Sequence, residues 1–132
     1  MSDHIVSSSA ISRVIQSKSK DSLLLVDTNI SKIFDIDDAT KVNAKDGKIL
    51  DIGKEIPTYN CIDCGIFRLD SRFFNAMRIQ MQNNQDSISA GIQVLIKNGD
   101  MSVVYTKDND YWLDIDTPDA YFHAQKNLSN LI

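Results

Sequence analysis

The sequence near the C-terminus reads Trp112-Leu113-Asp114-Ile115-Asp116-Thr117-Pro118-Asp119, which joins the end of an expected strand to the start of an expected helix. Side chains two positions apart on a strand point to the same side, so Asp114 and Asp116 can face one crevice together. Thr117 can cap a helix that begins at Pro118, where a missing N–H has no cost. The segment therefore predicts paired carboxylates at a strand-to-helix corner.

Such a corner suits a divalent cation that carries a phosphorylated ligand. In open α/β sheets, ligands bind outside the carboxyl ends of strands, and oxygen ligands of this kind suit Mg²⁺. The acids also have a purely structural explanation, because negative charge near a helix N-terminus is stabilised by the helix dipole. The segment alone leaves both explanations open.

The rest of the sequence predicts helices and strands in alternation. The expected elements are a helix at 8–18, a strand at 22–27, a hairpin at 40–44 and 48–52 around Asp46-Gly47, a strand at 62–69, helices at 71–81 and 87–98, a strand at 101–106 and a helix at 120–131. The apolar run at 22–27 is typical of a strand covered on both faces, as in a parallel sheet. A stripe on the helix at 71–81 is expected in the core: Phe73, Phe74, Met77 and Met81. This order predicts an α/β fold in which the hairpin is an irregular insert.

Length and charge set limits on the kind of protein. A chain of 132 residues, 42% hydrophobic and 24% charged, fits one globular domain. The net charge of -4 and the pI near 4.9 predict no nucleic-acid partner and no anionic membrane surface as partner. No apolar run is long enough to span a bilayer, and the N-terminal residues lack the pattern of a secretory signal. We therefore expect a cytoplasmic protein.

Two cysteines form a CxxC pair, Cys61 and Cys64. A structural zinc site requires four ligands, and His4 and His123 stand far away with no ligand-like spacing. A redox CxxC normally opens a helix, whereas the residues that follow this pair are typical of a strand. We expect reduced cysteines on a strand, and neither a zinc protein nor a thiol-redox protein.

Four segments resemble, in their order, the later half of the nucleotidyltransferases that activate sugar, inositol or choline phosphates. They are 1–5, 37–42, the pair 52–55 and 62–67, and 114–118. The hairpin and the strand after it are most similar to archaeal inositol-1-phosphate cytidylyltransferase-like members. The resemblance implies that residues 1–132 form one domain, a partial Rossmann-like fold of the glycosyltransferase-A type with a mixed sheet. This domain would correspond to the acceptor-and-metal half and would lack the N-terminal nucleotide-binding strands.

The resemblance also implies a set of site residues. Asp3 and Asp116 would hold Mg²⁺, with Asp114 as the alternative ligand, because transfer between two polyanions requires charge neutralisation. Contact with the phosphorylated acceptor would come from Lys54, Glu55, Asp63, Cys64 and Gly65. Lys54 could equally be a solvated surface lysine, and Asp3 could belong to a frayed terminus.

One family feature has no counterpart in this sequence. Members begin with a Gly-rich loop that cradles the nucleotide phosphates, but the five glycines here are dispersed. We therefore expect the chain alone to be inactive toward an NTP. We also expect the strand at 23–26 to have an open apolar edge, covered by a second copy of the chain or by a separate nucleotide-binding chain.

Two functions fit these observations. The first is transfer of a nucleotidyl group from an NTP to a sugar, inositol or other alcohol phosphate, with release of pyrophosphate, this chain supplying the acceptor and metal side. The second is a non-catalytic regulatory module or subunit that binds a phosphorylated polyol.

Overall fold

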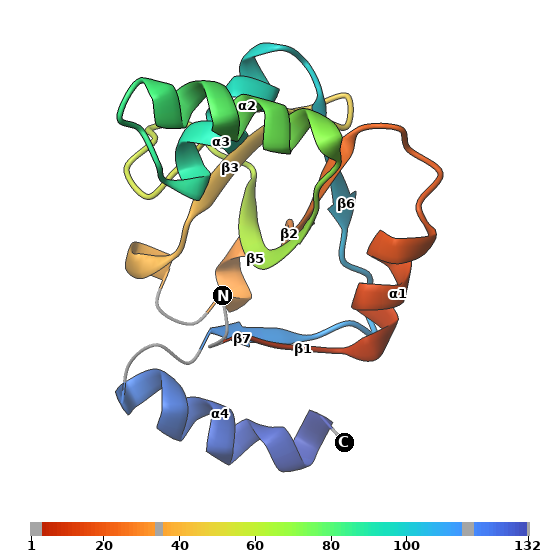
Figure 1. Cartoon of the computed structure of the whole chain (residues 1–132). Helices are drawn as coiled ribbons and strands as arrows, with labels where there is room; N and C mark the ends of the chain where they lie inside the picture. The colour runs from red at the N-terminus through yellow and green to blue at the C-terminus, as the bar shows by residue number, and fades with distance from the viewer. Residues whose placement is uncertain (1–3, 34–35, 115–117, 132) are drawn as a thin grey trace.

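The computed structural model describes residues 4–33, 36–114 and 118–131, and side chains at 114, 120, 124 and 127–131 are outside the description. The strands are β1 (His4–Val6), β2 (Ser22–Asp27), β3 (Lys41–Lys45), β4 (Lys48–Gly53), β5 (Cys61–Arg68), β6 (Met101–Tyr105) and β7 (Trp112–Asp114). The α-helices are α1 (Ser8–Gln16), α2 (Ser71–Gln82), α3 (Ile88–Lys97) and α4 (Pro118–Leu131), with short 3-10 turns at Ile30–Lys32 and Ile36–Asp38 (Figure 1).

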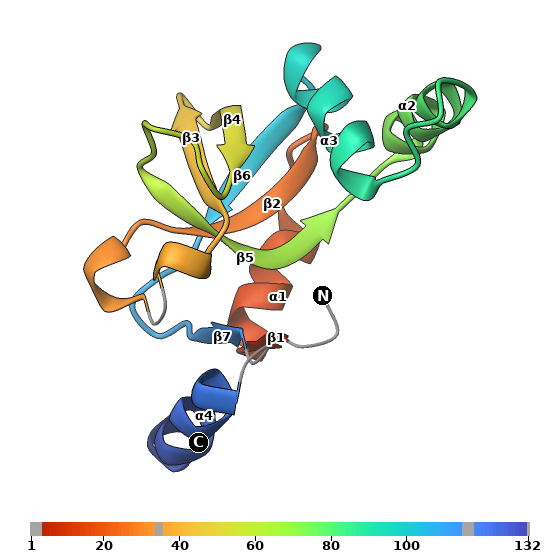
Figure 2. The same ribbon diagram turned by 90° about the vertical axis from the view of Figure 1, so that its left-hand side faces the viewer.

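Five strands form a closed barrel in the order β2-β5-β3-β4-β6. The sheet is mixed, as predicted, because β2 runs parallel to β6 and antiparallel to β5. The hairpin β3–β4 closes the barrel, with Lys48 of β4 opposite Ser102 of β6 (Figure 2). Two expectations were therefore wrong: the hairpin is part of the main sheet instead of an insert, and β2 has a partner strand on each edge, so residues 23–26 have no open edge.

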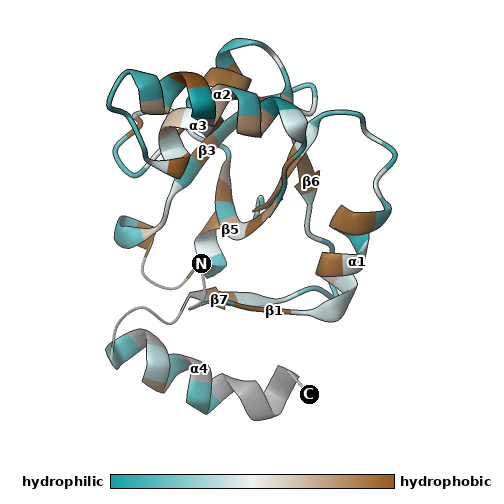
Figure 3. Cartoon of the chain, in the orientation of Figure 1, coloured by the Kyte–Doolittle hydropathy of each residue, from teal (hydrophilic) through white to brown (hydrophobic). Residues whose placement is uncertain are grey.

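The buried strand β2 supplies side chains to two cores. Leu24 and Val26 belong to a cluster inside the barrel, whereas Leu25 packs with Cys64 against α1. Side chains alternate between the two faces of a strand, so an unbroken apolar run can fill both clusters. The prediction of a strand covered on both faces is confirmed. Figure 3 shows the same hydrophobic character along β2 and β6.

The hairpin turn and the α2–α3 pair depend on glycines. Asp46 and Gly47 have φ angles of 54° and 80°, as the predicted two-residue turn requires. In α3, a Cβ at Gly91 would lie 2.6 Å from the sulfur of Met77, so the missing side chain allows the close packing of α3 on α2. Phe73 is buried and Met77 packs on the core, as predicted.

The other half of the predicted stripe faces outward. Phe74 is 63% exposed and Met81 is 59% exposed. Positions 74 and 81 are separated by about two helical turns and lie about 80–100° around the helix from the buried Phe73, so both project away from the core. The core prediction was wrong for Phe74 and Met81.

One arginine joins β5 to the end of α1. The Arg68 guanidinium donates hydrogen bonds to the carbonyl oxygens of Val14 (2.9 Å), Ile15 (3.3 Å), Ser17 (2.8 Å) and Ser19 (2.7 Å). These include carbonyls of the last helical turn, which lack partners within the helix. Arg68 therefore fixes α1 against the barrel wall.

The remaining two strands form a separate antiparallel ribbon, β1–β7. His4 lies opposite Asp114, Ile5 opposite Leu113 and Val6 opposite Trp112. The ribbon lies below the barrel next to α1, and α4 lies beyond it in both views (Figures 1 and 2). α4 begins at Pro118 as predicted. Among the residues that the structure describes, no helix has the length and apolar character needed to cross a membrane.

Candidate functional site

The β1–β7 ribbon joins the two segments that carry the candidate metal ligands. β1 directly follows the segment with Asp3, and β7 ends at Asp114, two residues before Asp116. Asp3 and Asp116 lie outside the described residues, as does the side chain of Asp114. Within the described part, no three His, Cys, Asp or Glu side chains form a group that could hold a metal ion. The site formed by Asp3 and Asp116, with Asp114 as the alternative ligand, therefore stays a prediction.

Trp112 connects the ribbon to the barrel. Its indole Nε1 donates a hydrogen bond to Oδ2 of Asp27 at 2.9 Å. Oδ1 of Asp27 accepts a second hydrogen bond, from the backbone N–H of Asn29 at 2.8 Å. No local pattern in the sequence points to Asp27 as part of the site, because its partner, Trp112, is distant along the chain.

The His4 ring packs between Trp112 and Gly65. It stacks on the indole with ring centroids 6.5 Å apart and an interplanar angle of 16°. Gly65 has a φ of 83°, and a Cβ at this position would lie 2.6 Å from the His4 ring. The close approach to a strand that an isolated glycine permits is therefore made here by the His4 ring, from within the chain.

The two residues before Gly65 have different environments. Oδ1 of Asp63 accepts a hydrogen bond from the Gly65 N–H at 2.6 Å, and the Asp63 N–H donates to the Thr40 carbonyl at 3.0 Å. Cys64 is fully buried and packs against α1, so its thiol cannot reach a ligand at the surface. Glu55 is exposed at the end of the hairpin segment.

Both cysteines are free and buried on a strand, as predicted. Burial raises the pKa of the Cys61 thiol to about 11, and the nearby Asp27 carboxylate adds to this shift. Burial likewise raises the pKa of the Cys64 thiol. Thiolate is the reactive form, so neither residue is a nucleophile near neutral pH.

A buried lysine fixes the segment that contains Lys54. Lys41 is only 8% exposed, and its Nζ donates to the carbonyls of Ala39 at 3.1 Å and Lys54 at 3.0 Å. It also lies 6.0 Å from the centroid of the Tyr59 ring. The Lys54 side chain is itself 56% exposed and pairs with Asp38 at 3.3 Å. An exposed pair of this kind contributes little to stability, so the Lys54 ammonium remains accessible to a ligand.

The segment just before β7 is anchored on α1 by Asp110. Its carboxylate accepts hydrogen bonds from Ser9 Oγ and Arg13, both at 2.6 Å, and from the Lys107 N–H at 2.9 Å. The Asp110 side chain has no exposed surface. Burial alone would raise the pKa of Asp110, but the bonds from Ser9, Arg13 and Lys107 outweigh it and lower the pKa. Asp110 is therefore a charged, buried anchor.

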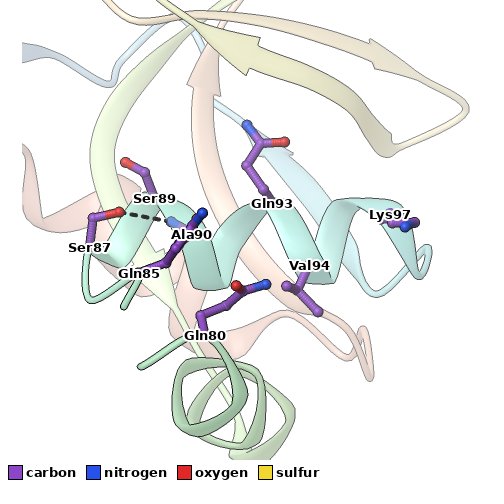
Figure 4. Close-up of a pocket in the computed structure, with 8 residues that line it drawn as sticks. All are labelled: Gln80, Gln85, Ser87, Ser89, Ala90, Gln93, Val94 and Lys97. Carbon is purple, nitrogen blue, oxygen red and sulfur yellow. Dashed lines mark hydrogen bonds between the residues drawn. The ribbon is translucent and has the colours of Figure 1, made fainter. Parts of the chain in front are cut away.

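A hollow of about 360 Å³ lies elsewhere, between α2 and α3 (Figure 4). It is lined by Gln80, Gln85, Ser87, Ser89, Ala90, Gln93, Val94 and Lys97. None of the site residues predicted from the sequence belongs to it, and its lining contains no carboxylate.

Comparisons with known proteins agree with the sequence resemblance. Residues 36–130 match the family described as nucleotidyl transferase. The bifunctional IPC transferase and DIPP synthase of Thermococcus kodakarensis is 30% identical over 97% of this chain and 28% of that protein. Its counterpart in Archaeoglobus fulgidus is 26% identical over 97% of this chain and 24% of that protein.

A solved structure shares the fold. The inositol-1-phosphate CTP transferase from T. maritima superposes with a TM-score of 0.80 and 23% identity, over 98% of this chain and 52% of that one. This likeness shows a common mixed α/β fold. The chain spans about a quarter of the length of the curated relatives that it matches, and about half of the solved chain.

Proposed function

The chain belongs to the nucleotidyl transferase family, and we propose that it supplies the acceptor and metal side of a nucleotidyl transfer reaction. The acceptor would be an inositol, sugar or other alcohol phosphate, and the donor an NTP. The observation that supports this most is the pairing of β1 with β7 beside Gly65 of β5. In this proposal residues 1–132 form one domain, a partial Rossmann-like unit of the glycosyltransferase-A type without the N-terminal nucleotide-binding strands.

The transfer reaction brings two negatively charged substrates together, so their phosphate charge has to be neutralised. An oxygen of the acceptor phosphate forms a bond to the α-phosphorus of the NTP, and the bond from the α-phosphorus to the bridging oxygen of pyrophosphate breaks. Members of this family usually depend on a divalent metal. A Mg²⁺ ion would neutralise charge on the phosphates, and the carboxylate oxygens of Asp3 and Asp116, or Asp114, are the donors that it prefers. In the sequence, Asp3 directly precedes β1 and Asp116 follows the end of β7 by two residues. The pairing of β1 with β7 therefore supports a shared site.

The acceptor side would use the segments that Lys41 and Asp63 hold in place. The main chain of Lys54 is fixed by Lys41, while its exposed ammonium can exchange Asp38 for an acceptor phosphate. Glu55 and Asp63 would bind hydroxyl groups, and the backbone of Gly65 would join them once the His4 ring that covers it is displaced. Cys64 would contribute only its backbone, because its thiol is buried.

The alternative is a module that binds a phosphorylated polyol without catalysis. The dispersed glycines favour it, since they form no phosphate-binding loop within these residues. If the chain takes part in transfer, the phosphate-binding side has to come from association with a nucleotide-binding chain or a second copy of this chain. Light scattering that shows a stable monomer at high concentration, with and without candidate partners, would contradict such association.

Binding and turnover separate these outcomes. We expect Mg²⁺-dependent binding of inositol 1-phosphate or glucose 1-phosphate in calorimetry, and its loss in Asp116→Ala with an unchanged circular dichroism spectrum. Unchanged magnesium affinity in Asp116→Ala would refute the metal assignment. Pyrophosphate release from CTP by this chain alone would refute its role as one side of a two-part site. Release only after a nucleotide-binding chain is added would exclude the non-catalytic alternative.

A further inference from the structure

Asp27 stands where three elements of the proposed site meet. It is the last residue of β2 and lies opposite Ile62 of β5, the residue just before Asp63. β6 ends at the same level, where the Thr106 N–H donates to the Val26 carbonyl at 2.9 Å. Asp27 is therefore at the carboxyl ends of the parallel pair β2–β6, the edge at which α/β folds place ligands.

The Asp27 carboxylate has a fixed orientation. One oxygen accepts from the backbone of Asn29 and the other from the indole of Trp112. The backbone contact holds the carboxylate in place, so its second oxygen presents a defined acceptor to the indole. A hydrogen bond to an ionised acceptor is stronger and more directional than one between neutral groups.

Trp112 transmits this orientation to the ribbon. It is the first residue of β7, faces Val6 of β1, packs on the core cluster beneath α1 and stacks on His4. His4 in turn covers Gly65 on β5. The Trp112 indole therefore links β7, which leads to the candidate metal ligands, to β5, which carries the candidate acceptor residues.

We propose that Asp27 is a positioning residue for the metal site: by holding the Trp112 indole, it fixes the β1–β7 ribbon, which leads to the candidate metal ligands, against the barrel end that carries β5. This inference rests on the proposed function. Asp110 anchors the start of the same segment on α1, but Asp27 is the described side chain that bonds β7 itself to the barrel end where the acceptor would bind.

The test uses the only tryptophan in the chain as a reporter. Mn²⁺ is titrated into the full chain, and its binding is followed by electron paramagnetic resonance and by quenching of Trp112 fluorescence. Loss of the partner that orients a metal site typically weakens metal affinity about 10-fold to 100-fold. We expect Asp27→Ala to show a loss of this size, and Asp27→Asn, which keeps an acceptor of the same shape, to recover part of it.

A matched control stands at the other end of β2. Asp21 precedes the strand and accepts hydrogen bonds from Lys48 and Ser102, so Asp21→Ala also removes a carboxylate with two partners. Urea denaturation is measured for every variant. We expect Asp21→Ala to lose stability and keep its Mn²⁺ affinity, which separates positioning from a general loss of stability.

Each remaining outcome has a distinct meaning. Asp27→Ala with altered Trp112 emission but unchanged Mn²⁺ affinity would overturn the inference and leave the proposed function intact. If Asp27→Ala does not fold, Asp27→Asn decides, and wild-type affinity together with altered emission in Asp27→Asn would overturn it as well. A wild-type chain that binds no Mn²⁺ would remove the proposed function and the inference together.

Discussion

Replacing Gly65 by alanine tests how the ribbon is held against the barrel. The φ of 83° is strained for alanine, which costs about 1–2 kcal/mol. The added Cβ would lie 2.6 Å from the His4 ring, so the ring has to move and its stacking on Trp112 is lost. An aromatic pair contributes about 0.5–1.5 kcal/mol. We expect Gly65→Ala to lower the free energy of unfolding by about 1.5–3.5 kcal/mol, the combination of the two effects.

The assay is urea denaturation followed by Trp112 fluorescence, with Gly47→Ala as the control. Gly47 has a similar φ of 80°, but a Cβ there would meet nothing within 4 Å. Gly47→Ala therefore measures the backbone strain alone and should leave the Trp112 emission unchanged. If Gly65→Ala costs no more than Gly47→Ala and leaves the native emission as in wild type, the reasoning about His4 is refuted.

Three further predictions concern stability and reactivity. Arg68→Met should lower the free energy of unfolding in urea by about 2–3 kcal/mol, because the carbonyls at the end of α1 lose a charged donor, and Arg68→Lys should recover only part of this. The pKa of Asp110 is lower in the folded chain than in the unfolded chain, where it is about 3.9. The Asp110 carboxylate therefore contributes fully to stability above the unfolded pKa, and this contribution is lost as the pH falls through the lower folded pKa. Urea midpoints between pH 5 and pH 2 should therefore fall less in Asp110→Asn than in wild type, and parallel profiles would contradict this. Cys61 and Cys64 should resist iodoacetamide in the native chain at pH 8 and react only after unfolding, as mass spectrometry would show, and rapid native labelling would contradict their burial.

Local signals in the sequence predicted most of the elements. The Asp46-Gly47 turn, the apolar run at 22–27 and the helix start at Pro118 each depend on neighbouring residues, and each is confirmed. Closure of the barrel depends on strands far apart in the sequence, such as the pair of Lys48 and Ser102. No local pattern specifies that pairing, and none specifies the pairing of β2 with both β5 and β6, so the open edge expected at β2 was wrong.

The same distinction holds for the site. Gly65 was named from the family resemblance as a candidate acceptor contact, but the His4 ring that covers it could not be predicted, because the two residues are distant in the sequence. Nothing in the local sequence distinguishes Lys41 from any other lysine on a strand, and only the fold shows that it is buried and bonded to the carbonyl of Lys54. The bond between Asp27 and Trp112 joins two strands whose relation depends on the whole topology.

Paramagnetic broadening by bound Mn²⁺ tests most directly whether the two ends of the chain share one metal site. In ¹H–¹⁵N spectra of the wild-type chain, we expect substoichiometric Mn²⁺ to broaden the amide signals of His4–Val6 and Trp112–Asp114 together, and that of Gly65 with them. Asp116→Ala should abolish this broadening. Broadening confined to one of the two strands, or centred on another part of the molecule, would contradict the shared site.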